Sequence, residues 1–185
     1  MKIYFYILML TSLIFSCANT KKSSGNQKPA THQTVTDSLN WQNKYGFKYT
    51  IPPHWQTTVS DLEATDLQGH IKSVEFDYKI NDNANLQMVF HPGESGLKLF
   101  NTYYNSRRKN LGQTTINKLQ AVKITEQILT DGKGHPLAKP VNRTKIFLLN
   151  SDKSACLELN FELKGQDPKA LAAFESFLKN IKPAK

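Results

Sequence analysis

The sequence predicts an α+β domain in which antiparallel strands pack against two helices. Apolar and polar residues alternate over residues 71–80 and again over 155–163, which is the period of a strand with one buried face. A spacing near 3.6 residues links Leu171, Phe174 and Leu178 and indicates a helix. Because turn residues separate most of the alternating segments, we expect neighbouring strands to pair as hairpins.

The first predicted strand contains Phe47, Tyr49 and Ile51, which alternate with polar residues. Pro52 and the proline after it end this strand, because proline cannot donate to a strand ladder. Trp55 follows directly, and we expect it to fold back onto the core.

A hairpin is predicted next, with its turn at residues 81–84. The apolar side chains of its two strands should share one buried face. They are Val74, Phe76, Tyr78 and Ile80 in the first strand and Leu86, Met88 and Phe90 in the second. Glu75 and Asp77 point to the other face, and Pro92 and Gly93 end the second strand.

A helix is predicted from residue 97 to residue 110, with Ser95 as its candidate N-cap and Gly112 as the residue that ends it. Gly93-Glu94-Ser95-Gly96 also resembles part of the nucleophile elbow G-x-S-x-G, but position 97 is leucine. No second or third member of a catalytic triad is indicated, so we assign Ser95 a capping role.

Three more strands and a final helix complete the domain. Residues 119–129 should form one strand, and the glycine-rich segment 131–136 a loop. The strongest predicted pair joins 143–149 to 155–163 through a polar turn, with Cys156 on the more polar face.

Asp167 and Pro168 are suited to begin the last helix, as N-cap and first helical residue. We expect its apolar stripe to consist of Leu171, Phe174, Leu178 and Ile181, with Phe177 beside them. Pro183 ends the helix.

The N-terminal residues 1–16 are predicted to be a lipoprotein signal peptide. The apolar stretch from Ile3 to Phe15 is shorter than the roughly 20 residues of a membrane-spanning helix. Ile14-Phe15-Ser16-Cys17 resembles the lipobox of bacterial lipoproteins, in which Ser16 precedes the cleavage and Cys17 becomes the lipidated N-terminus. The alternative, a cysteine in an N-terminal core helix, lacks a polar face to support it.

Residues 17–38 would then be the lipidated cysteine and a flexible linker, and 39–185 a single domain. In the lipoprotein sorting rule, alanine rather than aspartate after the cysteine favours the outer membrane. Lys21 and Lys22, in place of an acidic run, favour the periplasmic side. We therefore expect a protein of the bacterial cell envelope whose lipid on Cys17 holds it in the membrane.

Few other sites are indicated. Asp37-Ser38-Leu39 resembles the acceptor motif of some bacterial O-glycosylation systems, which makes Ser38 a candidate glycosylation site. Cys156 has no partner for an intramolecular disulfide once Cys17 is lipidated. The histidines and cysteines lack ligand spacing, so no metal, cofactor or catalytic residue is expected. The formal charge of +9 suits a solvated basic surface or contact with anionic lipid, and nucleic acid is not an expected partner outside the cytoplasm.

Both ends of the domain resemble a known family. Tyr45-Gly46-Phe47, then Ile51-Pro52 and Trp55, is similar to the opening strand of PsbP-like domains. The closing hairpin and the helix containing Phe174 and Phe177 resemble that family's last elements. The resemblance implies an α/β/α sandwich that binds or assembles other proteins and is not an enzyme. Metal sites of photosynthetic members are not carried over, because no ligand motif matches.

The leading hypothesis is therefore a non-catalytic module that binds another envelope protein. The alternative is a carrier of a small apolar ligand held between sheet and helix, which would need a cavity lined by aromatic side chains. An enzyme is the third hypothesis, and it would require acidic or histidine side chains that converge in a cleft.

Overall fold

A computed structural model describes residues 45–107 and 111–184. The signal peptide 1–16, the linker 17–38, and the sites predicted at Ser16, Cys17 and Ser38 lie outside the described residues. Those assignments therefore stay predictions, as does the start of the domain at residue 39.

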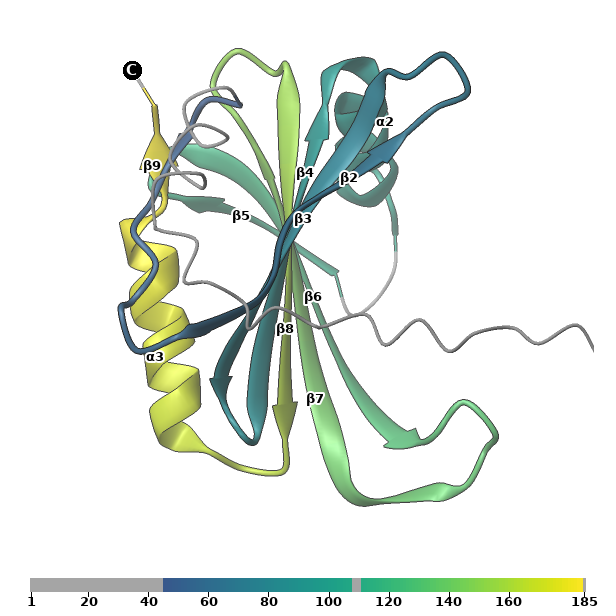
Figure 1. The fold of residues 1–185 in the computed structure, drawn as a ribbon, viewed down its shortest axis with the longest axis vertical. Coiled ribbons are helices and arrows are strands. Elements are labelled where there is room, and N and C mark those ends of the chain that lie inside the picture. The colour runs from purple at the N-terminus through teal and green to yellow at the C-terminus, as the bar shows by residue number, and fades with distance from the viewer. Residues whose placement is uncertain (1–44, 108–110, 185) are drawn as a thin grey trace, which may run out of the picture. The chain divides into compact units, whose positions relative to one another are not determined.

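Within the described residues, seven strands form one antiparallel sheet in the order β2-β3-β4-β8-β7-β6-β5. Helix α3 covers one face of the sheet and helix α2 packs on the other, which confirms the α+β class and the sandwich arrangement (Figure 1). The strands are β2 (Gln56–Thr65), β3 (Ile71–Asn81), β4 (Ala84–Pro92), β5 (Leu111–Ile116), β6 (Leu119–Thr130), β7 (Pro136–Leu149) and β8 (Ala155–Lys164). The helices are α2 (Gly93–Tyr104) and α3 (Pro168–Asn180), and β1 (Phe47–Lys48) pairs with β9 (Lys182–Pro183).

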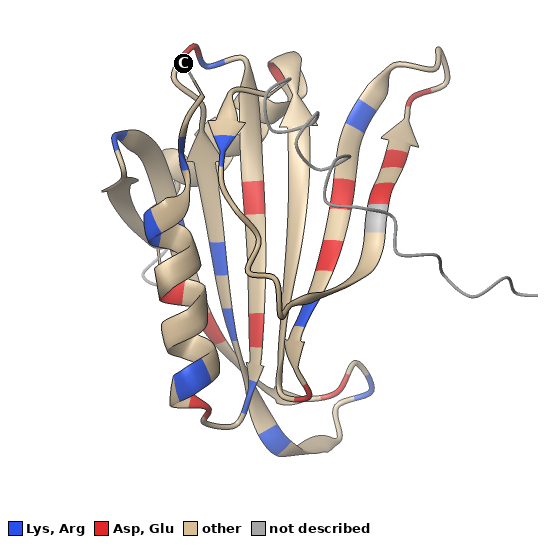
Figure 2. Ribbon diagram, turned by 60° about the vertical axis from the view of Figure 1, so that its left-hand side comes forward, with Lys and Arg blue, Asp and Glu red and all other residues tan. Residues whose placement is uncertain are grey.

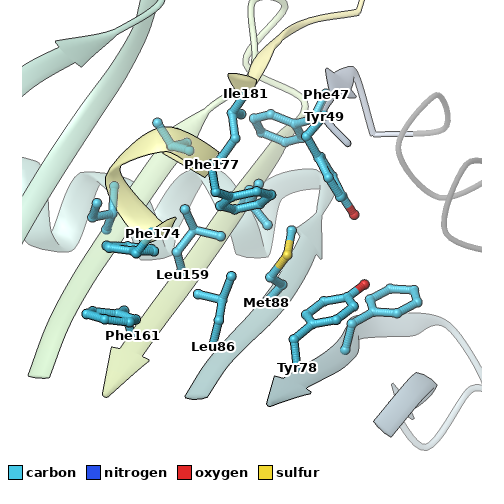
Figure 3. Packing of buried hydrophobic residues seen from close by; sticks show 14 of the residues in the cluster. Phe47, Tyr49, Tyr78, Leu86, Met88, Leu159, Phe161, Phe174, Phe177 and Ile181 are labelled. Carbon is cyan, nitrogen blue, oxygen red and sulfur yellow. The ribbon is translucent and has the colours of Figure 1, made fainter. Parts of the chain in front are cut away.

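The main core lies between the sheet and α3 and is rich in aromatic rings (Figure 3). Phe161 of β8 stacks on Phe174 of α3 with ring centroids 4.2 Å apart. Phe177 packs against Trp55 and Tyr49, at centroid distances of 5.3 and 5.8 Å. Each fully buried phenylalanine contributes about 1.5–3 kcal/mol through the hydrophobic effect. The predicted inward faces of β3, β4 and β8, and the inward fold of Trp55, are confirmed.

Helix α3 begins as predicted, with the Asp167 side chain accepting a hydrogen bond from the Ala170 N–H at 3.0 Å. Its buried residues are Ala170, Phe174 and Phe177, and Ile181 is buried just after the helix. The prediction for Leu171 was wrong, because its side chain is 42% exposed. The spacing of Ala170, Phe174 and Phe177 rotates the apolar stripe away from Leu171, whose larger size made it look like the core residue.

Helix α2 differs from the predicted helix at both ends. It begins at Gly93, directly after β4, because Gly93 has a φ of +63° and turns the chain from strand into helix. Ser95 is therefore inside the first turn, where its hydroxyl donates to the Pro92 carbonyl at 2.9 Å, and it does not cap the helix. The helix ends at Tyr104, and Gly112 belongs to strand β5, so its predicted role was wrong.

The two edge strands were not predicted. Strand β2 has mostly exposed, polar side chains and several register shifts, including one near Asp61, whose φ is +49°. Strand β5 is similarly exposed in its middle. Strand β1 is also shorter than predicted, although Phe47 and Tyr49 are buried as expected. An edge strand needs no continuous apolar face, so alternation in the sequence does not reveal it.

Candidate functional site

The sheet face that carries α2 is only partly covered. Phe100 of α2 packs on residues near one end of the central strands, which include Val122, Phe147, Leu149 and Cys156. Cys156 thus lies on the face predicted for it, opposite the main core, but α2 buries it completely. Past the end of α2, the same face of the sheet carries polar side chains.

The strand register arranges these polar side chains in two rows across the sheet. Partners in an antiparallel ladder lie opposite each other and on the same face. One row contains Asp77, Gln87, Asn160 and Lys145, from β3, β4, β8 and β7. The next contains Lys79, Asn85, Glu162, Arg143 and Glu126, from β3, β4, β8, β7 and β6.

A chain of hydrogen bonds connects the polar side chains along this surface. The Gln87 amide donates to Glu75 at 2.8 Å, and its oxygen accepts from the Asn160 amide at 2.9 Å. The Asn160 amide also donates to Glu158 at 3.0 Å. The other oxygen of Glu158 lies 3.0 Å from His91 Nε2. The side-chain amides are therefore held in fixed orientations.

The acidic groups on this surface differ in their surroundings. Burial alone would raise the pKa of Glu158, but hydrogen bonds from His91 and Asn160 and the charge of Lys145 outweigh it and keep that pKa low. The pKa of Asp77 is raised, mainly by burial and then by the neighbouring Glu75 carboxylate.

Arg143 holds two further carboxylates in place. Its Nη2 and Nε atoms donate to Glu162 at 2.6 and 2.8 Å, and its Nη1 donates to Glu126 at 3.2 Å. The charges of both glutamates are thus directed toward Arg143. Figure 2 shows acidic positions along the strands of the sheet, although the chain as a whole is basic.

A groove of about 330 Å³ lies at the β2–β3–β4–β8 side of this surface. It is lined by Thr58, Asp77, Tyr78, Asn85, Leu86, Gln87, Asn160 and Glu162. Two of its oxygen atoms, Asp77 Oδ1 and Asn160 Oδ1, are shielded from solvent and accept no hydrogen bond within the described part of the chain. A shielded acceptor without a donor is costly, so a ligand donor toward which the Asp77 and Asn160 side chains turn would complete the site. We call this cavity the polar groove.

Two other groups of side chains, around Cys156 and at Ser95, have local structural explanations. His91 lies directly opposite Cys156 in the β4–β8 ladder and also contacts Glu158, which superficially resembles a Cys-His-Glu triad. The Cys156 thiol is fully buried and its pKa is raised by burial, so it is not available as a thiolate nucleophile. Ser95 is bonded to the backbone of its own helix turn and therefore has a structural role.

Two further histidines stabilise matching hairpin tips. His70 and His135 each follow a glycine in the pattern Asp-x-x-Gly-His, and each ring contacts the aspartate of its own loop, Asp66 or Asp131. These aspartates also accept two backbone N–H groups each, so the repeat is explained by turn formation. No group of three or more potential metal-binding side chains occurs in residues 45–107 and 111–184.

The alternative hypothesis places an apolar ligand between the sheet and a helix. The region between the sheet and α3 is filled by the packed rings of the main core. A second cavity, also about 330 Å³, lies at the side of this region, where Ile116 of β5 and Leu178 of α3 contribute to its lining.

In the described part of the chain, neither helix is long and apolar enough to cross a membrane.

Comparisons with known proteins identify the fold and little more. No protein family and no curated protein sequence matches the chain. A crystal structure of a protein from Bacteroides thetaiotaomicron is similar over 77% of this chain and 46% of that protein, with 12% identity and a TM-score of 0.52. The chain thus spans about half the length of that protein, and the likeness shows the fold alone.

A crystal structure of LpqN, described as involved in cell envelope biogenesis of Mycobacterium tuberculosis, is also similar. The match covers 75% of this chain and 83% of LpqN, with 9% identity and a TM-score of 0.42. A TM-score this low carries no argument about this chain.

The sequence alone did not indicate the polar groove. The outward direction of Glu75 and Asp77 could be read from the alternation in β3, and that of Asn160 from the alternation in β8. The missing information was that β4 inserts between β3 and β8, which places Gln87 between Asp77 and Asn160. Residue patterns do not specify which distant strands become neighbours.

Proposed function

We propose that the protein is a lipid-anchored, non-catalytic module of the bacterial cell envelope that binds another envelope protein through the polar groove and the surface around it. The observation that carries the proposal is the pair of shielded, unpartnered oxygens, Asp77 Oδ1 and Asn160 Oδ1, in a groove on an otherwise ordered sheet. An acceptor left without a donor is destabilising in the isolated domain, and a partner could compensate for it.

The arrangement of side chains favours binding over catalysis. Gln87, Asn160 and Glu158 hold one another through hydrogen bonds of 2.9–3.0 Å, which gives a rigid recognition surface. The nucleophilic side chains weighed above, Ser95 and Cys156, lie outside this groove and are held or buried. The lipobox at Ile14–Cys17 and the polar linker add the expected membrane tether. The outer membrane and its periplasmic side are part of the proposal.

Site-specific photo-crosslinking in intact cells tests the proposal. A photoreactive amino acid at Asn85, an exposed residue lining the groove, should crosslink one dominant envelope protein, which mass spectrometry would identify. The matched control carries the same amino acid at Ala172, an exposed residue of α3 on the opposite face. Equal products from both positions, or none from Asn85, would contradict the proposed binding surface.

The anchor is tested separately with Cys17→Ala. The wild-type chain should incorporate labelled palmitate and sediment with membranes, whereas the variant should do neither. Palmitate incorporation that survives the substitution would show that the lipobox assignment is wrong. An intact mass equal to lipid plus polypeptide alone would dismiss glycosylation at Ser38.

A further inference from the structure

We infer that the polar groove recognises a protonated lysine or arginine side chain of the partner protein. This inference rests on the proposed function and specifies the chemistry of recognition. It follows from three features of the groove: the polar atoms left without partners, the distribution of charge, and the size of the cavity.

The groove presents acceptors to a ligand, because its principal donors are already used. The Gln87 amide donates to Glu75, and the Asn160 amide donates to Gln87 and Glu158. The Asp77 Oδ1 and Asn160 Oδ1 atoms remain without a donor in the described part of the chain. A ligand that completes these two atoms must therefore bring N–H or O–H groups, and Asn85 is the lining residue whose side-chain amide can still donate to it.

The distribution of charge around the groove favours a ligand whose donor group is positively charged. On this face Lys79 pairs with Asp82 at 2.6 Å, Arg143 pairs with Glu162, and Lys145 is 4.0 Å from Glu158. Each of these cations is directed toward a carboxylate other than Asp77.

Asp77 thus has a carboxylate neighbour, Glu75, a hydrogen bond from the Gln87 side chain, and no cation paired with it among the described residues. Because the whole chain has a formal charge of +9, a local excess of negative charge here does not follow from its composition. A ligand ammonium or guanidinium would supply both the missing donor and the missing positive charge.

The size of the groove fits the end of one side chain. A volume of about 330 Å³ is at the lower limit of ligand cavities. The described residues offer no cluster of three or more metal ligands, so a bare metal ion is a poorer match than a hydrogen-bonding cation. Arginine or lysine projecting from a protein surface is the occupant that agrees with the proposed function.

Nuclear magnetic resonance titration of the full-length protein in non-ionic detergent tests the inference. The probes are N-acetyl-lysine methylamide, N-acetyl-arginine methylamide and the neutral N-acetyl-norleucine methylamide, at low salt to limit screening. At least one cationic probe should cause saturable shifts in the side-chain amide signals of Asn85, Gln87 and Asn160. Norleucine that shifts the same signals with the same midpoint would overturn the inference.

Two variants locate the effect. Asp77→Asn keeps the shape and breaks no hydrogen bond at Oδ1, and it should weaken cationic probe binding about tenfold or more, the worth of one charge-assisted hydrogen bond. Thr58→Lys, at an exposed position lining the groove, supplies a competing ammonium within the chain and should also abolish binding. Glu175→Gln, exposed on α3, is the charge-matched control and should bind normally.

The outcomes separate this inference from the proposed function. Undiminished probe binding by Asp77→Asn would overturn the inference, whereas crosslinking from Asn85 would still support a protein partner at this surface. Spermidine is titrated as a further cationic probe. If it binds and both amino-acid probes fail, the ligand is a free polyamine, and the inference of a partner's side chain is overturned. Absence of saturable binding by every cationic probe would overturn the inference altogether.

Discussion

Replacing Gly96 by alanine should displace α2 and destabilise the domain. Gly96 is buried where α2 crosses strands β4 and β8. A Cβ atom built on Gly96 would lie 2.1 Å from the His91 carbonyl oxygen, 2.9 Å from the His91 carbonyl carbon and 3.0 Å from the Cys156 nitrogen. All three are backbone atoms of the sheet, so no side-chain rotation can relieve the contact.

The size of the effect follows from these distances. Ordinary contact starts near 3.4 Å, so α2 must move outward by about 1 Å. A gap of about 0.5–1 Å forfeits a quarter to a half of the dispersion energy of the separated atoms, and Phe100 is the large side chain under α2 that would lose contact. Overpacking of this kind costs about 1–3 kcal/mol, while alanine in place of glycine in a helix gains about 1 kcal/mol. Because the 2.1 Å contact is with backbone, the cost should lie in the upper part of this range, about 2–3 kcal/mol, and we expect a net loss of roughly 1–2 kcal/mol in the free energy of unfolding.

Urea unfolding of the full-length protein, followed by far-ultraviolet circular dichroism, measures this loss. With a slope of about 2 kcal/mol per molar urea, within the usual range of about 1–3, the midpoint should fall by roughly 0.5–1 M. Gly132→Ala is the control, because its Cβ would meet no atom within 4 Å and its φ is not in the left-handed region. A midpoint for Gly96→Ala that equals or exceeds that of Gly132→Ala would refute the reasoning.

Three further predictions concern the main core, the α3 cap and the pH dependence of stability. Phe177→Ala should lower the free energy of unfolding by about 3–5 kcal/mol because the ring is buried, whereas Leu171→Ala, at a side chain 42% exposed, should change it by less than about 1 kcal/mol in the same urea experiment. Asp167→Ala should cost about 1 kcal/mol through loss of the N-cap hydrogen bond, and Asp167→Asn should retain most of it; equal losses would contradict the capping role. Burial alone would raise the folded-state pKa of Glu158, but the hydrogen bond from His91 helps keep it below the unfolded value. Glu158 therefore stabilises the fold at pH values above its unfolded pKa. This stabilisation is lost as the pH falls through the folded pKa. Unfolding measured between pH 3 and 7 should therefore show the wild type and Glu158→Gln converging toward low pH, and a constant difference would contradict this linkage.

The sequence predicted the central strands well because their side chains have two clearly different environments. In β3 and β8 every second residue faces the aromatic core, so the alternation survives in the sequence. The Asp167-Pro168 start of α3 was equally predictable, since capping depends on adjacent residues. These elements are specified by local chemistry and did not require knowledge of the topology.

The errors occurred where distant parts of the chain determine the outcome. Ser95 looks like an N-cap locally, but the turn at Gly93 starts the helix earlier. The alternation correctly placed Cys156 on the more polar face, opposite the main core, but it did not predict that α2 returns over that face and buries it. The polar groove depends in the same way on the insertion of β4 between β3 and β8.

The lengths of the elements explain why a polar surface remains on one side of the sheet. Helix α2 has 12 residues and is about 18 Å long, whereas β7 has 14 residues and extends about 46 Å. On the opposite face α3 is similarly short, but Phe47, Tyr49 and Trp55 add a second apolar cover. No described segment adds a second apolar cover beside α2, and the side chains there are the two hydrogen-bonded polar rows. That part of the sheet is therefore in contact with water or with a partner. For this reason the unpartnered oxygens of the polar groove favour a binding surface there.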